Sequence, residues 1–121
     1  MHSTAHESRP MRKFVEIRSY SIEPGTRAAF HHAVETQLIP FLIQRGIDVV
    51  AFRPSPHDDS SYYVIRAYDS LAHRSDSQDT MYASDEWKNG PRENILSFID
   101  YYTSVVIEMD EAMVQALREP V

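Results

Sequence analysis

Apolar and polar side chains alternate from Val15 to Tyr20, the pattern of a strand with two different faces. Val15 and Ile17 share one face, whereas Glu16, Arg18 and Tyr20 share the other. Because the first face is apolar, we expect helices to cover it. The second face carries an acid, a base and a phenol in a row, which suits either solvent or a second subunit.

A helix is predicted over residues 26–45, where apolar side chains recur at helical spacing and Gly46 supplies the stop. Pro40 lies inside this helix, where it removes one backbone hydrogen bond and its ring clashes with the preceding turn. We therefore expect the helix to bend near residues 36–40.

The remaining pattern completes one small fold. Strands are expected over residues 47–53, 61–68 and 101–109, and helices over residues 71–77, from Pro91 onward and over 110–119. The order βαββαβ predicts an α+β, ferredoxin-like fold with one four-stranded antiparallel sheet and helices on one face. We expect a disordered leader at 1–11, a folded domain at 12–110 and a C-terminal helical tail at 111–121.

Helices on one face of the sheet would leave the other face bare. We place Glu16, Arg18, Arg66 and Glu108 on the bare face, where two acids and two bases can neutralise each other once enclosed. The other side chains that we place there are Tyr20, Val50, Phe52, Val64, Tyr68, Tyr102 and Val106. So many rings and branched chains do not suit water as one patch. We therefore predict a homodimer whose sheets close face to face, with the four charged residues at the dimer interface.

The composition and net charge of the chain argue against several classes of binding partner. A net charge of −6 argues against nucleic acid, and no apolar stretch approaches the ~20 residues of a membrane span. The chain has no cysteine that could bind a metal ion. His31 and His32 are adjacent in a predicted helix, where their side chains point about 100° apart, so they cannot chelate one ion together. Residues 1–10 have no apolar stretch and carry Glu7, so we expect no secretory signal there. We expect a cytoplasmic protein with no metal and no cofactor.

Three short motifs resemble the NIPSNAP family. They are Glu16-Ile17-Arg18-Ser19-Tyr20 followed by Pro24-Gly25, then Tyr68-Asp69-Ser70-Leu71-Ala72 with Arg74, then Ser84-Asp85-Glu86-Trp87. The likeness spans Phe14 to Met109. It implies a fold of the dimeric α/β-barrel superfamily, related in shape to small cofactor-free monooxygenases and haem-degrading enzymes. It implies no settled biochemical activity.

The candidate site residues are aromatic rings and one histidine. Tyr20, Tyr68 and Trp87 are the candidates for lining an apolar ligand pocket, although each ring also suits core or interface packing. Tyr68 and His73 are the candidates for a catalytic role, since both can hold or move a proton.

The sequence is compatible with three functions. Seven tyrosines, five phenylalanines and one tryptophan favour a homodimer that binds a small hydrophobic or aromatic ligand. The alternative is an enzyme resembling the cofactor-independent monooxygenases, and a further alternative is a non-catalytic protein-interaction dimer. The sequence argues against a hydrolase and against a nucleotide-binding protein, because the chain has neither a Gly-x-Ser-x-Gly elbow nor a glycine-rich phosphate loop.

Overall fold

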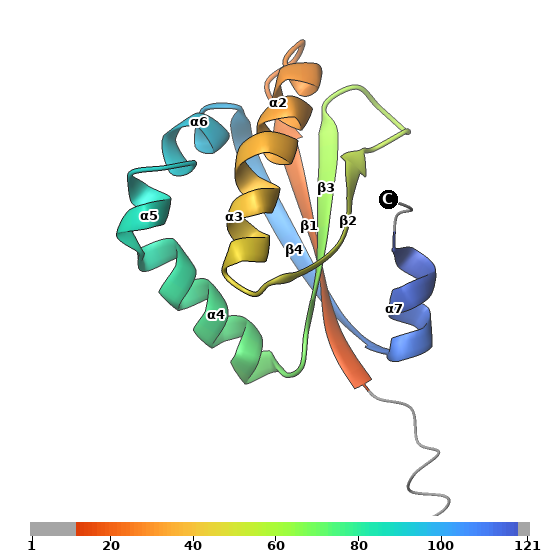
Figure 1. The fold of residues 1–121 in the computed structure, drawn as a ribbon. Helices are drawn as coiled ribbons and strands as arrows, with labels where there is room; N and C mark the ends of the chain where they lie inside the picture. Colours follow the sequence, from red (N-terminus) through yellow and green to blue (C-terminus); the bar gives the residue numbers. More distant parts are fainter. Residues whose placement is uncertain (1–11, 119–121) are drawn as a thin grey trace, which may run out of the picture.

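The computed structural model of the chain describes residues 12–118 (Figure 1). The expected leader at 1–11 and residues 119–121 lie outside the described residues. The strands are β1 (Arg12–Ile22), β2 (Asp48–Pro54), β3 (Ser61–Tyr68) and β4 (Ile99–Asp110). The helices are α2 (Arg27–Ala33), η1 (Val34–Leu38), α3 (Ile39–Gln44), α4 (Leu71–Ala83), α5 (Asp85–Lys88), α6 (Arg92–Ser97) and α7 (Glu111–Leu117).

The four strands form one antiparallel sheet in the order β2-β3-β1-β4. The predicted α+β, ferredoxin-like architecture is therefore confirmed. Helices α2 to α6 belong to one side of the sheet, and Figure 1 shows α4, α5 and α6 following one another along it. None of the helices in residues 12–118 is long and apolar enough to cross a membrane.

The first helical stretch is interrupted where the sequence predicted a bend. A π-helical turn, η1, separates α2 from α3, and Pro40 occupies the first turn of α3. A proline has no N–H to donate to the carbonyl four residues earlier, and a widened turn accommodates that lost bond. The second helical stretch is longer than expected, because α4 continues to Ala83.

The two faces of the sheet are the reverse of our prediction. Tyr20, Val64 and Tyr68 join the core beneath the helices, whereas Val15 and Ile65 join a second core on the opposite side. The strand register puts Glu16 opposite Arg66, so both charged side chains also point toward the helices. Their burial is possible because α4 brings polar side chains to meet them. Of the apolar residues that we placed on the bare face, only Val50 belongs to the second core. A β-bulge between Val49 and Ala51 turns its side chain to that side of the sheet.

Helix α7 covers part of the second face. Val114 is its fully buried residue and packs with Val15 and Met109, whereas Met113 and Leu117 are 52% and 38% exposed. Because α7 contacts only one end of this face, the rest remains uncovered. We call that remainder the open face, and it carries Ile17, Tyr63, Tyr101, Val105 and Ile107.

Candidate functional site

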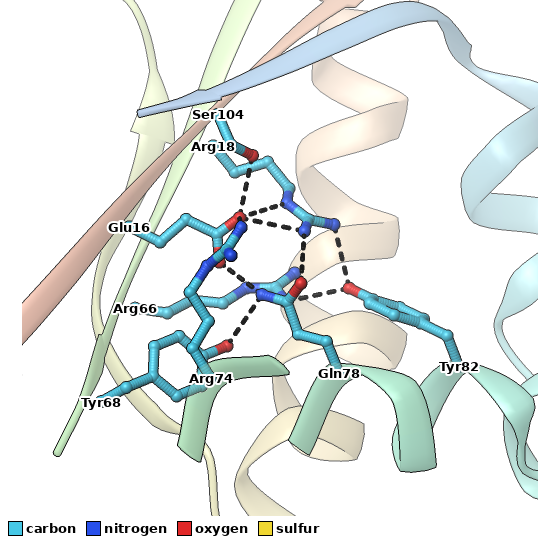
Figure 2. A network of polar contacts seen from close by, with 8 residues as sticks. All are labelled: Glu16, Arg18, Arg66, Tyr68, Arg74, Gln78, Tyr82 and Ser104. Atoms are coloured by element: carbon cyan, nitrogen blue, oxygen red, sulfur yellow. Dashed lines mark hydrogen bonds and ion pairs between the residues drawn. The ribbon is translucent and has the colours of Figure 1, made fainter. Parts of the chain in front are cut away.

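Eight polar side chains form a cluster between the sheet and α4 (Figure 2). Four of the eight, all from β1 and β3, are buried, and we call the set the buried polar cluster. The strands contribute Glu16 and Arg18 from β1, Arg66 and Tyr68 from β3, and Ser104 from β4; α4 contributes Arg74, Gln78 and Tyr82. Alternation on β1 puts Glu16 and Arg18 on one side of the sheet. A spacing of four residues puts the three α4 side chains on one side of the helix, so the two sets face each other.

Glu16 lies at the centre of the buried polar cluster and is fully buried. Its Oε2 accepts hydrogen bonds from Arg18 Nε at 3.1 Å and Nη2 at 3.0 Å, from Arg74 Nη2 at 3.3 Å and from Ser104 Oγ at 2.8 Å. Its Oε1 accepts a hydrogen bond from Gln78 Nε2. Burial by itself would raise the pKa of Glu16, but the charge of Arg18 and the bonds from Arg74 and Ser104 outweigh it and lower the pKa to about 2. Glu16 is therefore a carboxylate at neutral pH.

Arg66 is also fully buried, but it has few partners. Its Nη1 donates to the hydroxyl oxygen of Tyr82 at 2.9 Å, and Arg18 Nη1 donates to the same oxygen at 3.1 Å. Among the described residues, Arg66 Nε and Nη2 have no hydrogen-bond partner, and no carboxylate forms an ion pair with Arg66. One phenol oxygen thus supplies the hydrogen bonding of this guanidinium.

The buried polar cluster is unbalanced in charge. Arg18, Arg66 and Arg74 bring three positive charges, and Glu16 brings one negative charge. Two positive charges are therefore uncompensated by the side chains of the cluster. Such an excess in a region of low dielectric favours a negative partner.

A pocket of about 310 Å³ opens beside the buried polar cluster. Its walls come from β1, β4 and the helices between them: Arg18, Tyr20, Leu38, Tyr82, Trp87, Arg92, Ile95, Leu96, Ile99 and Tyr102. Arg18 and Tyr82 belong to both the pocket and the cluster. The Arg18 guanidinium lies over the Tyr102 ring at 4.8 Å, and the Tyr82 and Trp87 rings meet edge to face at 5.1 Å. The pocket is thus an aromatic cavity with one charged wall.

The predicted ligand-binding residues separate in the structure. Tyr20 and Trp87 line the pocket. Tyr68 is absent from the lining and belongs to the buried polar cluster, where its hydroxyl accepts a hydrogen bond from Gln78 at 3.2 Å. His73 lies at the start of α4, with its Nδ1 accepting from the Asp69 backbone N–H at 3.0 Å and its ring 5.5 Å from the Tyr68 ring. The two catalytic candidates are thus neighbours outside the pocket.

The four predicted interface residues do not form one patch. Glu16, Arg18 and Arg66 lie under α4, so their placement on the bare face is wrong. Glu108 is half exposed on the edge strand β4 and pairs with Arg12 at 3.3 Å. The reason is that α4 presents its own polar side chains to the sheet, which removes the need for a second subunit to enclose the charges.

The histidines of α2 form no metal site. His31 Nδ1 hydrogen bonds to the Tyr62 hydroxyl at 2.6 Å, and His32 is exposed. Within residues 12–118, no three His, Asp or Glu side chains lie close enough together to hold a metal ion.

The family comparison covers most of the chain. Residues 15–108 match the model of the NIPSNAP family. No curated protein matches the chain in sequence.

Solved structures of the same fold include two described as NIPSNAP proteins. One is an uncharacterized NIPSNAP domain protein from Burkholderia xenovorans, with 20% identity, a TM-score of 0.70 and coverage of 78% of this chain and 91% of that one. The other, from Agrobacterium tumefaciens, is a NIPSNAP family protein with unknown function, with 21% identity, a TM-score of 0.75 and coverage of 83% and 90%.

The fold extends beyond these two structures. A putative antibiotic biosynthesis monooxygenase from Nitrosomonas europaea is similar with 13% identity, a TM-score of 0.61 and coverage of 82% of this chain and 90% of that one. At this identity the likeness concerns the fold alone. The match to the family model covers residues 15–108, and on this basis the chain belongs to the NIPSNAP family.

Proposed function

We propose that this chain is a homodimeric protein that binds a small hydrophobic or aromatic molecule in the pocket between β1, β4 and α6. The observation that carries the proposal is the pocket itself. Its volume of about 310 Å³ lies at the lower end of the range of small-molecule sites, about 300–1,000 Å³. Its lining of rings and aliphatic chains beside a few polar groups is the usual make-up of such a site.

The chain offers an internal reporter for binding. Trp87 is its only tryptophan and lies in the pocket wall. A ligand that stacks in the pocket should change the emission of Trp87 and raise the melting temperature, since binding to the folded state stabilises it. Titration with 2-naphthamide, an uncharged aromatic probe, should therefore shift both signals with one common dissociation constant.

A matched pair of variants localises that binding. Leu96 is 42% exposed and lines the pocket, whereas Ile43 is 60% exposed on α3 and does not line it. Leu96→Glu should weaken binding of the probe, and Ile43→Glu should leave it unchanged. Saturable binding that survives Leu96→Glu, or no binding at all, would count against the pocket.

The homodimer is supported by the open face. Tyr101, Val105 and Ile107 are 65%, 57% and 40% exposed there, although all three are large and apolar. A contiguous apolar patch of this kind usually marks an interaction surface. A second copy of the same sheet would offer the same surface in two-fold symmetry.

An enzyme resembling the cofactor-independent monooxygenases is the second candidate. The observation in its favour is Tyr82: the residue lines the pocket, and its hydroxyl oxygen accepts hydrogen bonds from Arg18 and Arg66. A phenol fixed in this way beside the pocket can exchange a proton with a bound substrate. Oxygen uptake with a quinol substrate would test it. Turnover should disappear in Tyr82→Phe, and the Tyr68→Phe and His73→Ala variants ask whether the two earlier candidates take part.

A further inference from the structure

The charged groups of the pocket are all of one sign. Within the described part of the chain, Arg18 and Arg92 line it, and no aspartate or glutamate does. Arg18 is nearly buried, with 7% of its surface exposed, whereas Arg92 is exposed at the rim. A ligand in the pocket therefore meets one cation deep in the wall and a second at the entrance.

Arg18 retains capacity for a ligand. A guanidinium has five N–H donors. Four take part in hydrogen bonds: two to Glu16 Oε2, one to Gln78 Oε1 and one to the Tyr82 hydroxyl. The fifth N–H is on Nη1, the atom that bonds the pocket residue Tyr82, and Arg18 also interacts with the hydroxyl of Tyr20, another pocket residue. A ligand carboxylate would compete with that neutral phenol for the fifth N–H.

The side chains behind Arg18 strengthen its positive field. Arg66 joins Arg18 through the shared Tyr82 oxygen, and Arg74 joins it through the shared Glu16 carboxylate. Among the described residues, Arg66 keeps two buried nitrogens without a partner, and Arg74 keeps one. Because Arg66 is fully buried, the effect of its charge reaches a neighbouring group with little screening, whereas the Arg74 side chain is 24% exposed and its charge is screened more. Glu16 offsets one of the three charges and no more.

We propose that the pocket selects organic anions, with the aromatic or apolar body of the ligand against Tyr20, Trp87 and Ile95 and a carboxylate against Arg18. This inference rests on the proposed binding function and names the chemical class of its ligand. A neutral ligand would occupy the same aromatic walls but leave the excess positive charge uncompensated. A cationic ligand would add to that excess.

A pair of probes of equal size tests the charge directly. 2-Naphthoate and 2-naphthamide share one ring system and differ in whether the substituent is a carboxylate or an uncharged amide. Isothermal titration calorimetry on the full chain should show the carboxylate binding about tenfold tighter or more, the range of a hydrogen bond to a charged group. In Arg18→Gln this preference should fall to at most the two- to fivefold expected from the exposed charge of Arg92, with the affinity for the amide little changed. Arg18→Lys, which keeps the charge, should restore part of it.

A rim variant covers the case in which Arg18→Gln does not fold. Arg92→Gln changes an exposed side chain and should reduce the preference for the carboxylate about two- to fivefold, as expected for an exposed charge. The matched control is Arg45→Gln, which removes the same charge from the residue that follows α3, outside the pocket lining, and should leave the preference intact.

The outcomes separate this inference from the proposed function. Equal affinity for the two probes in the wild-type chain would overturn the anion preference and leave the binding pocket standing. Failure of both probes to bind would overturn the binding function together with the inference. An equal loss of preference in Arg45→Gln would assign the effect to overall charge and overturn the role of Arg18.

Discussion

Arg66 on β3 donates a hydrogen bond from Nη1 to the hydroxyl oxygen of Tyr82 on α4, at 2.9 Å. This contact ties a fully buried cation to the helix that covers it. Tyr82 stands at the boundary between the buried polar cluster and the pocket, because its oxygen serves the arginines and its ring faces the ligand side. Packing of α4 and shaping of the pocket therefore depend on the same residue.

Removing the Tyr82 hydroxyl should destabilise the fold. Tyr82→Phe takes away the only hydrogen-bond acceptor that Arg66 has among the described residues. A buried donor left without a partner costs about 1–3 kcal/mol, and a charged donor costs more. Urea denaturation followed by circular dichroism should show that loss in the free energy of unfolding. Tyr101→Phe, at a ring that is 65% exposed, should change it by less than about 0.5 kcal/mol. Equal effects of the two variants would contradict the role given to Tyr82.

Neutralising Glu16 should have a larger effect. Glu16→Gln keeps the shape of the side chain but leaves Arg18, Arg66 and Arg74 without a buried carboxylate. Removing one partner of a buried ion pair costs about 3–5 kcal/mol. The same denaturation measurement checks this, with Glu108→Gln at a half-exposed ion pair as the control. A stable Glu16→Gln variant would show that the arginines find other partners.

The free energy of unfolding should depend on pH in acid, because Glu16 becomes protonated there. Its pKa is about 2 in the folded chain, against 4.5 for a free glutamate, so the folded state holds this proton less tightly than the unfolded state. The resulting stability is complete above pH 4.5 and is lost as the pH falls toward 2, up to about 3 kcal/mol in total. The difference in unfolding free energy between wild type and Glu16→Gln should therefore shrink across this window. A difference independent of pH would show that Glu16 is not shifted.

The element order could be predicted from the sequence because local signals mark it. Residues 61–68 alternate between two characters and match β3 residue for residue. Ser70 precedes α4 and accepts a hydrogen bond from the His73 backbone N–H, as an N-cap does. Pro40 marks the place where the helix widens. Each of these features depends only on nearby residues.

The direction of the sheet faces could not be predicted in the same way. Charged residues such as Glu16 and Arg66 read as solvent-facing or interface residues unless their partners are known, and those partners come from a distant helix. A signal was present in the sequence: Arg74, Gln78 and Tyr82 recur every four residues and form a polar stripe on α4. An apolar stripe is the usual sign of an inward face, so this stripe reads as solvent-exposed. The buried polar cluster joins two patterns that each look like surface.

The attachment of α7 depends on one buried side chain. Val114 is fully buried against the second core, while its neighbour Met113 is 52% exposed. Val114→Ala should reduce the free energy of unfolding by about 2 kcal/mol through lost burial and a small cavity, whereas Met113→Ala should change it by less than about 0.5 kcal/mol. Thermal denaturation of both variants checks this. A larger loss in Met113→Ala would place Met113, and not Val114, on the inward face of α7.

A charge introduced on the open face should disrupt the proposed homodimer. If two copies meet through this surface, a charge at its centre should be buried without a partner and should disfavour the dimer. Val105→Lys places that charge on β4, at a side chain that is 57% exposed in the single subunit. Light scattering across a concentration series should give twice the 14.0 kDa chain mass for the wild type and a shift toward the single mass for Val105→Lys.

Leu71→Lys is the matched control for this variant, because Leu71 is 54% exposed on α4 on the other side of the sheet. It introduces the same charge at a similar exposure and should leave the mass unchanged. A wild-type mass of 14.0 kDa at all concentrations would remove the homodimer from the proposed function. A dimer that tolerates Val105→Lys but not Leu71→Lys would move the interface to the helical side of the sheet.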